Sequence, residues 1–181
     1  PKPQNPSTMT RIIMIKTSII AFAEASRRKV IAAVGDSITR GYMSSDESQH
    51  SWPAQLQSML NPHTYFGMPF RTQYEVRNFG VNGRAVQKHS ILSYWREDRY
   101  QEALESNPDI VIIMLGTNDS WEGWNEEKYV KDYGEFIETF QALASKPDIY
   151  LMVPPPLYRD GKGQWKILFN QLTKPRRHVI N

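Results

Sequence analysis

The chain has 181 residues, enough for one domain with its own hydrophobic core and too few for two ordinary domains. Its composition of 40% hydrophobic and 23% charged residues is that of an ordinary globular protein, and no apolar run is long enough for a membrane-spanning helix. The absence of cysteine excludes disulfides, thiol catalysis and cysteine-bound zinc.

The net charge of +3 is distributed unevenly along the chain. Residues 1–30 and 155–181 each carry a net charge of +5, so the residues between them carry −7. Basic arms of this kind contact nucleic acid, anionic lipid or an acidic partner, or serve as solvated tails. We keep protein partners bound through these arms as a hypothesis and expect no specific nucleic-acid binding.

Residues 1–28 form a basic amino-terminal extension with the composition of a targeting or anchoring arm. The stretch MTRIIMIKTSIIAFAEA combines basic residues with a short apolar run that Lys16 interrupts. This pattern fits a poor signal peptide and also an organellar presequence, so the route stays open between secretory and organellar (mitochondrial). Because the sequence begins at Pro1 and not at Met, we expect processing or a longer product.

After residue 28 the sequence alternates between apolar runs typical of buried strands and amphipathic stretches typical of helices. The runs that predict strands are 29–36, 74–81, 109–116 and 148–156, and the helical stretches are 51–60, 96–107 and 126–145. The run 109–116 is the most apolar, so we expect it to be the central strand. The helix over 126–145 carries an aromatic face that we expect in the core.

Alternation of strands and helices with short loops predicts an α/β fold, a three-layer α/β/α sandwich around a parallel sheet of the flavodoxin-like kind. We assign this domain to residues 29–160 and a basic carboxyl-terminal tail to residues 161–181. The last residues, RHVIN, can begin a fifth strand, which we expect to be truncated or missing.

Polar, turn-rich clusters follow the first three predicted strands. They read GDSITRG (35–41), NFGVNGRA (78–85) and LGTNDS (115–120). Because the carboxyl ends of parallel strands share one edge of a sheet, we expect the three clusters to meet. Acyl transfer needs a hydroxyl nucleophile and donors for an oxyanion, and Ser37, the Gly83 N–H and the Asn118 side-chain amide are candidates for these roles.

These three blocks also carry a family resemblance. The sequence resembles the SGNH (GDSL-type) hydrolases over residues 29–160, and SWPAQLQSML and YEVRNFGVNGRA resemble sialate O-acetylesterase-like members. The resemblance implies that Ser37 is the nucleophile and that its N–H joins Gly83 and Asn118 in the oxyanion hole. Its supporting residues would be Asp36, which shapes the turn, Asn78 and Asp119, and it implies no cofactor.

The sequence departs from the family in its last block. The family carries Asp-x-x-His near its carboxyl end as the base and its orienting carboxylate, but here Pro175 stands three residues before His178. Only His50 follows a carboxylate, Glu47, at this spacing, which makes His50 a weak candidate for the base. As written, the site therefore lacks its usual Asp/His pair, and the hydrolase is expected to be incomplete or inactive, a pseudoenzyme if the chain ends at Asn181.

We therefore predict a serine ester hydrolase acting on a small acyl ester of a carbohydrate or similar alcohol. The alternative is a non-catalytic structural subunit of a large assembly, such as an organellar one, that retains the SGNH fold. The scattered histidines give no metal-ligand spacing, so we expect no metal site. Four aromatic residues near the second and third blocks either cover the core edge or form a sugar platform: Tyr94, Trp95, Trp121 and Trp124.

Overall fold

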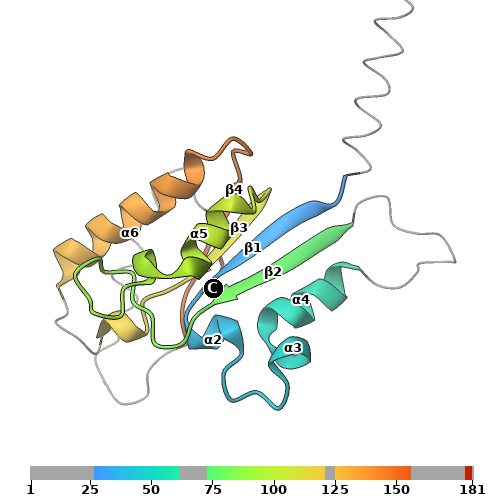
Figure 1. Cartoon of the computed structure of the whole chain (residues 1–181), viewed down its shortest axis with the longest axis horizontal. Helices are drawn as coiled ribbons and strands as arrows, with labels where there is room; N and C mark the ends of the chain where they lie inside the picture. The colour runs from blue at the N-terminus through green and yellow to red at the C-terminus, as the bar shows by residue number, and fades with distance from the viewer. Residues whose placement is uncertain (1–26, 62–72, 121–124, 156–177, 181) are drawn as a thin grey trace, which may run out of the picture.

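The structure, a computed structural model, describes residues 27–61, 73–120, 125–155 and 178–180 (Figure 1). The predicted amino-terminal arm, most of the predicted tail, Trp121 and Trp124 lie outside these residues. Among the helices in the described ranges, none combines the length and the apolarity needed to cross a bilayer.

The centre of the fold is a parallel five-stranded sheet with the order β2-β1-β3-β4-β5. Its strands are β1 (Lys29–Gly35), β2 (Tyr74–Gly80), β3 (Ile110–Met114), β4 (Asp148–Met152) and β5 (His178–Ile180). The prediction of a parallel sheet with 109–116 in the middle is confirmed. The fifth strand is present as three residues inside the predicted tail, and it pairs with β4.

Helices cover the sheet as an α/β/α sandwich requires. They are α2 (Ser37–Arg40), α3 (Glu47–His50), α4 (Trp52–Leu60), α5 (Asp98–Glu105) and α6 (Glu126–Gln141), with short 3₁₀ turns η1 (Tyr94–Arg96) and η2 (Asn118–Ser120). Figure 1 shows α5 and α6 together over the sheet and α2, α3 and α4 gathered beside β2. Local chemistry sets some of these starts: the Lys128 N–H donates to the side chain of Asn125, the cap of α6, and Pro53 lies in the first turn of α4.

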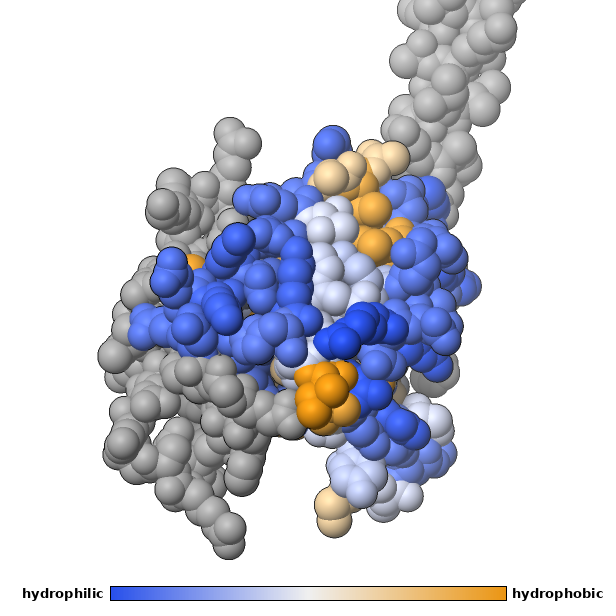
Figure 2. Space-filling view, turned by 60° about the vertical axis from the view of Figure 1, so that its left-hand side comes forward, coloured by the Kyte–Doolittle hydropathy of each residue, from blue (hydrophilic) through white to orange (hydrophobic). Residues whose placement is uncertain are grey.

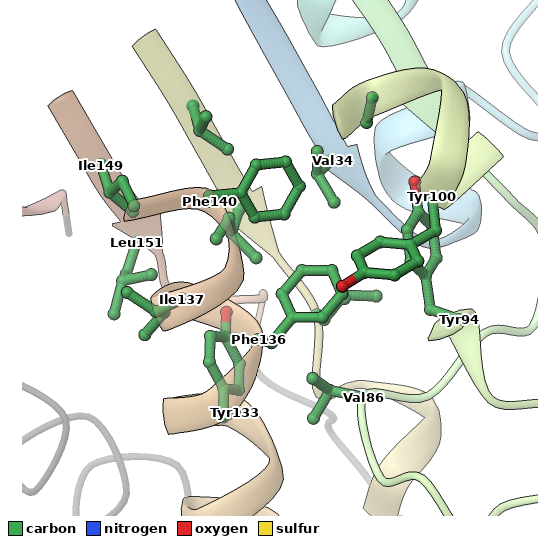
Figure 3. Packing of buried hydrophobic residues seen from close by; sticks show 14 of the residues in the cluster. Val34, Val86, Tyr94, Tyr100, Tyr133, Phe136, Ile137, Phe140, Ile149 and Leu151 are labelled. Carbon is green, nitrogen blue, oxygen red and sulfur yellow. The ribbon is translucent and has the colours of Figure 1, made fainter. Parts of the chain in front are cut away.

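The core lies between the sheet and helices α5 and α6. Alternate residues of β1 and β3, such as Val34 and Ile113, pack against an aromatic cluster, while their neighbours Ala33 and Ile112 are buried on the other face. Strands buried on both faces read as unbroken apolar runs, which is why the sequence identified them. Figure 3 shows Phe136 amid this cluster, and its ring centroid lies 5.1–5.8 Å from those of the residues Tyr94, Trp95, Tyr100 and Phe140.

The predicted aromatic face of the long helix is confirmed as core, because Tyr129, Tyr133, Phe136, Ile137 and Phe140 are all fully buried. Tyr94 is also fully buried and Trp95 packs against the core, so these two aromatics cover the core edge and are not a sugar platform.

Figure 2 shows a mostly hydrophilic face interrupted by a few compact apolar groups. In the described part of the chain, the exposed large apolar residues are Tyr42, Met43, Met59, Ile91 and Leu92. Four of these five lie in the loops that follow β1 and β2, so exposed apolar surface is concentrated near the carboxyl edge of the sheet.

We expect Phe136→Ala to lower the free energy of unfolding by about 3–5 kcal/mol, because it removes the ring at the centre of the aromatic cluster and leaves a cavity. Urea denaturation followed by circular dichroism measures this loss. Met59→Ala is the matched control, because Met59 is 75% exposed and its truncation should change the value by less than about 0.5 kcal/mol. Equal effects of the two substitutions would contradict the assigned core.

Candidate functional site: the loops beyond the strand ends

The predicted nucleophile lies where β1 turns directly into a short helix. Gly35 ends the strand, Asp36 caps α2, and Ser37 is the first residue of the helix. The Ile38 N–H donates to Asp36 Oδ1 at 2.9 Å, which fixes the turn. Ser37 itself is half-buried, and an N–H in the first turn of a helix has no acceptor within that helix, so it is available to a ligand.

Asp36, the residue that we expected to shape this turn, is fully buried. Burial raises the pKa of its carboxyl group above the ordinary value, and the hydrogen bond from Ile38 partly opposes this shift.

Helix α2 rests directly on the ends of β1 and β2, and two glycines permit this contact. A Cβ on Gly80 would overlap backbone atoms of Arg40 in α2, and a Cβ on Gly35 would overlap the side chain of Thr39 in α2. Asn78 adds a polar clamp: its side-chain amide donates to the Thr39 carbonyl at 3.0 Å, and its Oδ1 accepts from the Gly80 N–H at 2.9 Å. Asn78 therefore holds α2 against the end of β2.

The second loop begins beside the first. The Val81 N–H donates to the Gly35 carbonyl at 3.0 Å, which continues the pairing of β1 and β2 beyond the strand ends. Gly83 follows with a φ of +73°, a left-handed conformation that glycine adopts without strain. Further on, Ala85 pairs with the returning chain, donating to the Leu92 carbonyl and accepting from the Tyr94 N–H. The loop is thus a closed, hydrogen-bonded unit.

Asn118 connects the third loop to both of the others. Its Nδ2 donates to the Arg84 carbonyl at 3.0 Å, next to Gly83, and lies 3.4 Å from Asp36 Oδ2, next to Ser37. The side chain is half-buried, as are Ser37 and Gly83, so all three remain accessible to a small ligand. The convergence expected from the parallel sheet is therefore seen at the chain neighbours of Ser37 and Gly83.

Asp119 locks the second loop onto the third from inside. Its Oδ2 accepts from the Val86 N–H at 3.0 Å and its Oδ1 from the Gln87 N–H at 2.9 Å. The carboxyl group is almost fully buried, and this burial raises its pKa to about 6 despite the two hydrogen bonds. Nothing in the local sequence indicated that 86–87 would be the partners, because the contact spans more than 30 residues.

The candidate base is placed away from this cluster of contacts. The His50 ring nitrogen Nδ1 lies 2.7 Å from Ser45 Oγ, and both residues are exposed. Glu47, the carboxylate expected to orient His50, instead accepts from Arg40 Nε at 3.0 Å. These contacts give His50 no support as the base for Ser37. Within the described residues, no group of three or more His, Asp or Glu side chains is arranged to hold a metal ion.

Comparison with known proteins supplies the context for this arrangement. The chain matches the model of the GDSL-like lipase/acylhydrolase family over residues 33–174. It is 33% identical over 120 residues to the acetylxylan esterase of Xylanibacter ruminicola, which covers 66% of this chain and 22% of that protein. It is 25% identical over 153 residues to the acetylxylan esterase / glucomannan deacetylase of Cellvibrio japonicus, which covers 70% of this chain and 42% of that protein.

Among solved structures, AlinE4, an SGNH-hydrolase family esterase, matches with a TM-score of 0.59 and 25% identity, covering 85% of this chain and 76% of that one. The chain spans less than half the length of the two curated relatives, the acetylxylan esterase of Xylanibacter ruminicola and the enzyme of Cellvibrio japonicus.

Gly80→Ala should destabilise the protein by about 1–3 kcal/mol, because the added methyl group would overlap backbone atoms of Arg40 that cannot rotate away. Gly134→Ala is the control: a Cβ there meets nothing within 4 Å, and alanine in the middle of α6 should stabilise by about 0.5–1 kcal/mol. Urea unfolding of both variants tests the pair, and a Gly80 variant as stable as the parent protein would contradict the close seating of α2.

Asp119 should make stability depend on pH in a defined direction. Its folded-state pKa of about 6 lies above the ordinary 3.8, so the folded protein binds this proton more tightly than the unfolded chain. The stabilisation is fully present below about pH 4 and is lost as the pH rises through about 6, a change on the order of 3 kcal/mol.

Unfolding free energies of the parent protein and of Asp119→Asn, measured at several pH values across this window, test the assignment. The parent should lose more stability than the variant as the pH rises, and parallel profiles would exclude it. Asp46→Asn is the control of opposite sign, because hydrogen bonds from Ser48 lower the pKa of Asp46 and its stabilisation is lost as the pH falls.

Proposed function

The chain belongs to the GDSL-like lipase/acylhydrolase family, and from this premise we propose that it carries the nucleophile and the oxyanion-binding groups of a serine ester hydrolase acting on an acetylated carbohydrate. The observation that carries the proposal is the Asn118 side chain, which touches the chain neighbours of both Ser37 and Gly83. The printed names of the two curated relatives, acetylxylan esterases, support a carbohydrate acetyl ester as the substrate class.

In the proposed reaction the Ser37 hydroxyl attacks the ester carbonyl carbon. The Oγ–C bond forms, the carbonyl oxygen becomes an oxyanion, and the hydroxyl proton passes to a base. The C–O bond to the sugar then breaks, and the sugar oxygen leaves as a hydroxyl with that proton. Water attacks the acetyl-enzyme in the same way and releases acetate.

Three donors are proposed to stabilise the oxyanion: the N–H groups of Ser37 and Gly83 and the amide of Asn118. One Asn118 N–H is committed to the Arg84 carbonyl at 3.0 Å. The other has only the long 3.4 Å contact with Asp36 and can turn to a stronger acceptor. The charge concentrated on the former carbonyl oxygen makes it a stronger acceptor, at ordinary hydrogen-bond distance, than a carboxyl oxygen 3.4 Å away, so this bond strengthens as the transition state forms, which is what catalysis requires.

The base is not assigned among the described residues, since His50 contacts Ser45 and His89 is exposed on the second loop. Without a base, a serine hydrolase retains about 10³–10⁴-fold catalysis over water from its oxyanion hole and binding groups. The incomplete-enzyme prediction and the alternative of a non-catalytic assembly subunit therefore both remain predictions, and the reactivity of Ser37 decides between enzyme and subunit.

A fluorophosphonate probe should label the folded protein at Ser37. Ser37→Ala should abolish the labelling, and Asn118→Ala should slow it by about 10²-fold or more through loss of an oxyanion donor. Ser45→Ala is the control, because Ser45 is an exposed serine hydrogen-bonded to a histidine yet outside the proposed site. Mass spectrometry of the labelled peptide identifies the modified serine. Absence of labelling under conditions that modify a known serine hydrolase would refute the proposed activity.

A further inference from the structure

A cavity of about 600 Å³ opens at the edge of the sheet, beside the carboxyl end of β2. Figure 1 shows α2 and α3 on one side of this strand end and α5 on the other, and all three elements line the cavity together with β2. The volume falls within the range of small-molecule sites. Its charged lining consists of two arginines and four carboxylates: Arg40, Arg99, Glu47, Glu97, Asp98 and Glu102.

These charges are largely arranged as pairs. Arg40 Nε lies 3.0 Å from Glu47, Arg99 Nη1 lies 2.7 Å from Glu102, and Glu97 accepts at 2.6 Å from Nε of Arg84, which is not a lining residue. The Arg40–Glu47 and Arg99–Glu102 pairs are exposed, and exposed ion pairs add little to folding stability, so their hydrogen-bonding capacity is available to a ligand.

The paired charges select for a neutral ligand rich in hydroxyl groups. An anion would face four carboxylates, and a cation would have to compete with arginines that already hold three of them. A hydroxyl group both donates and accepts, so neighbouring hydroxyls can donate to a carboxylate and accept from the guanidinium beside it. A sugar ring has this chemistry along its whole edge.

The cavity wall includes residues close in the chain to the proposed catalytic turn, and Ser37 itself is not a lining residue. Arg40 lies three residues after Ser37, so both face the same side of the single turn of α2. Gly80 and Val81 form part of the cavity wall, and the Val81 N–H is bonded to the carbonyl of Gly35, just before the nucleophile turn. The Asn78 clamp on α2 holds this wall in place.

We propose that this cavity binds an unesterified sugar unit of the substrate polysaccharide, while an acyl ester on another sugar unit of the same polysaccharide is presented to Ser37. The inference rests on the proposed function, because it takes the polymer attached to the ester as the ligand. None of the lining residues is aromatic, so no ring stacks on the sugar and only hydrogen bonds hold it. Each such bond gains little over water, so we expect a dissociation constant on the order of 1 mM for a short oligosaccharide.

Titration of the ¹⁵N-labelled protein with unacetylated xylotetraose tests the proposal by NMR. The amide signals of Arg40, Asn78, Gly80 and Arg99 should shift together with saturation. Arg99→Ala should weaken binding at least about tenfold, because it removes one donor pair and leaves Glu102 unpaired. Lys131→Ala is the control: it breaks another exposed pair, with Glu135 on α6, outside the cavity, and should leave binding unchanged.

The ligand has no ester, so this binding does not require a reactive serine, and Ser37→Ala should retain it. If the fluorophosphonate labels Ser37 but xylotetraose at about 10 mM shifts no amide signal of the cavity, this inference fails and the proposed function stands. If the sugar binds in the cavity but Ser37 is never labelled, the proposed function fails alone. Shifts confined to other surfaces, or tighter binding of an acidic tetragalacturonate than of xylotetraose, would also overturn the inference.

Discussion

Asp119 is a buried carboxylate whose two oxygens both accept backbone hydrogen bonds from the loop after β2. Placing a charge in the interior is costly, as the raised pKa of this group shows. The cost is offset because the N–H groups of Val86 and Gln87 are themselves buried and would otherwise lack acceptors. A carboxylate satisfies two such donors at once, so it fixes the position of the loop that carries Gly83 relative to Asn118.

The nucleophile turn depends on a second constraint, which is steric. Helix α2 can rest on the strand ends only because Gly35 and Gly80 have no side chain there. Asp36 then caps the helix that begins at Ser37, while Asn118 reaches from the third loop to the carboxylate of Asp36. The two constraints are independent, one set by close packing and the other by buried hydrogen bonds, and together they bring residues from three distant blocks to one place.

Much of this arrangement follows from sequence, for identifiable reasons. Strands such as β1 and β3 are buried on both faces, so they stand out as apolar runs, and a parallel sheet necessarily gathers their carboxyl ends. The partners of Asp119 were not predictable, because the loop over 81–93 is irregular and its contacts are long-range. Spacing alone also does not reveal that Arg40 donates to Glu47, the carboxylate three residues before His50.

Burial separates two roles that the same side-chain chemistry takes in this fold. Asp36 and Asp119 lie in the interior, where desolvation makes each hydrogen bond to a backbone N–H decisive for the shape of a loop. Glu47 and Glu102 lie at the surface beside arginines, where water competes for every bond and the pairs contribute little to the fold. A carboxylate can bind a ligand when exchanging its present hydrogen bond for one to the ligand costs little free energy. Asp36 and Asp119 therefore build the site, and the surface ion pairs around the cavity can exchange their bonds to recognise the sugar units next to the ester.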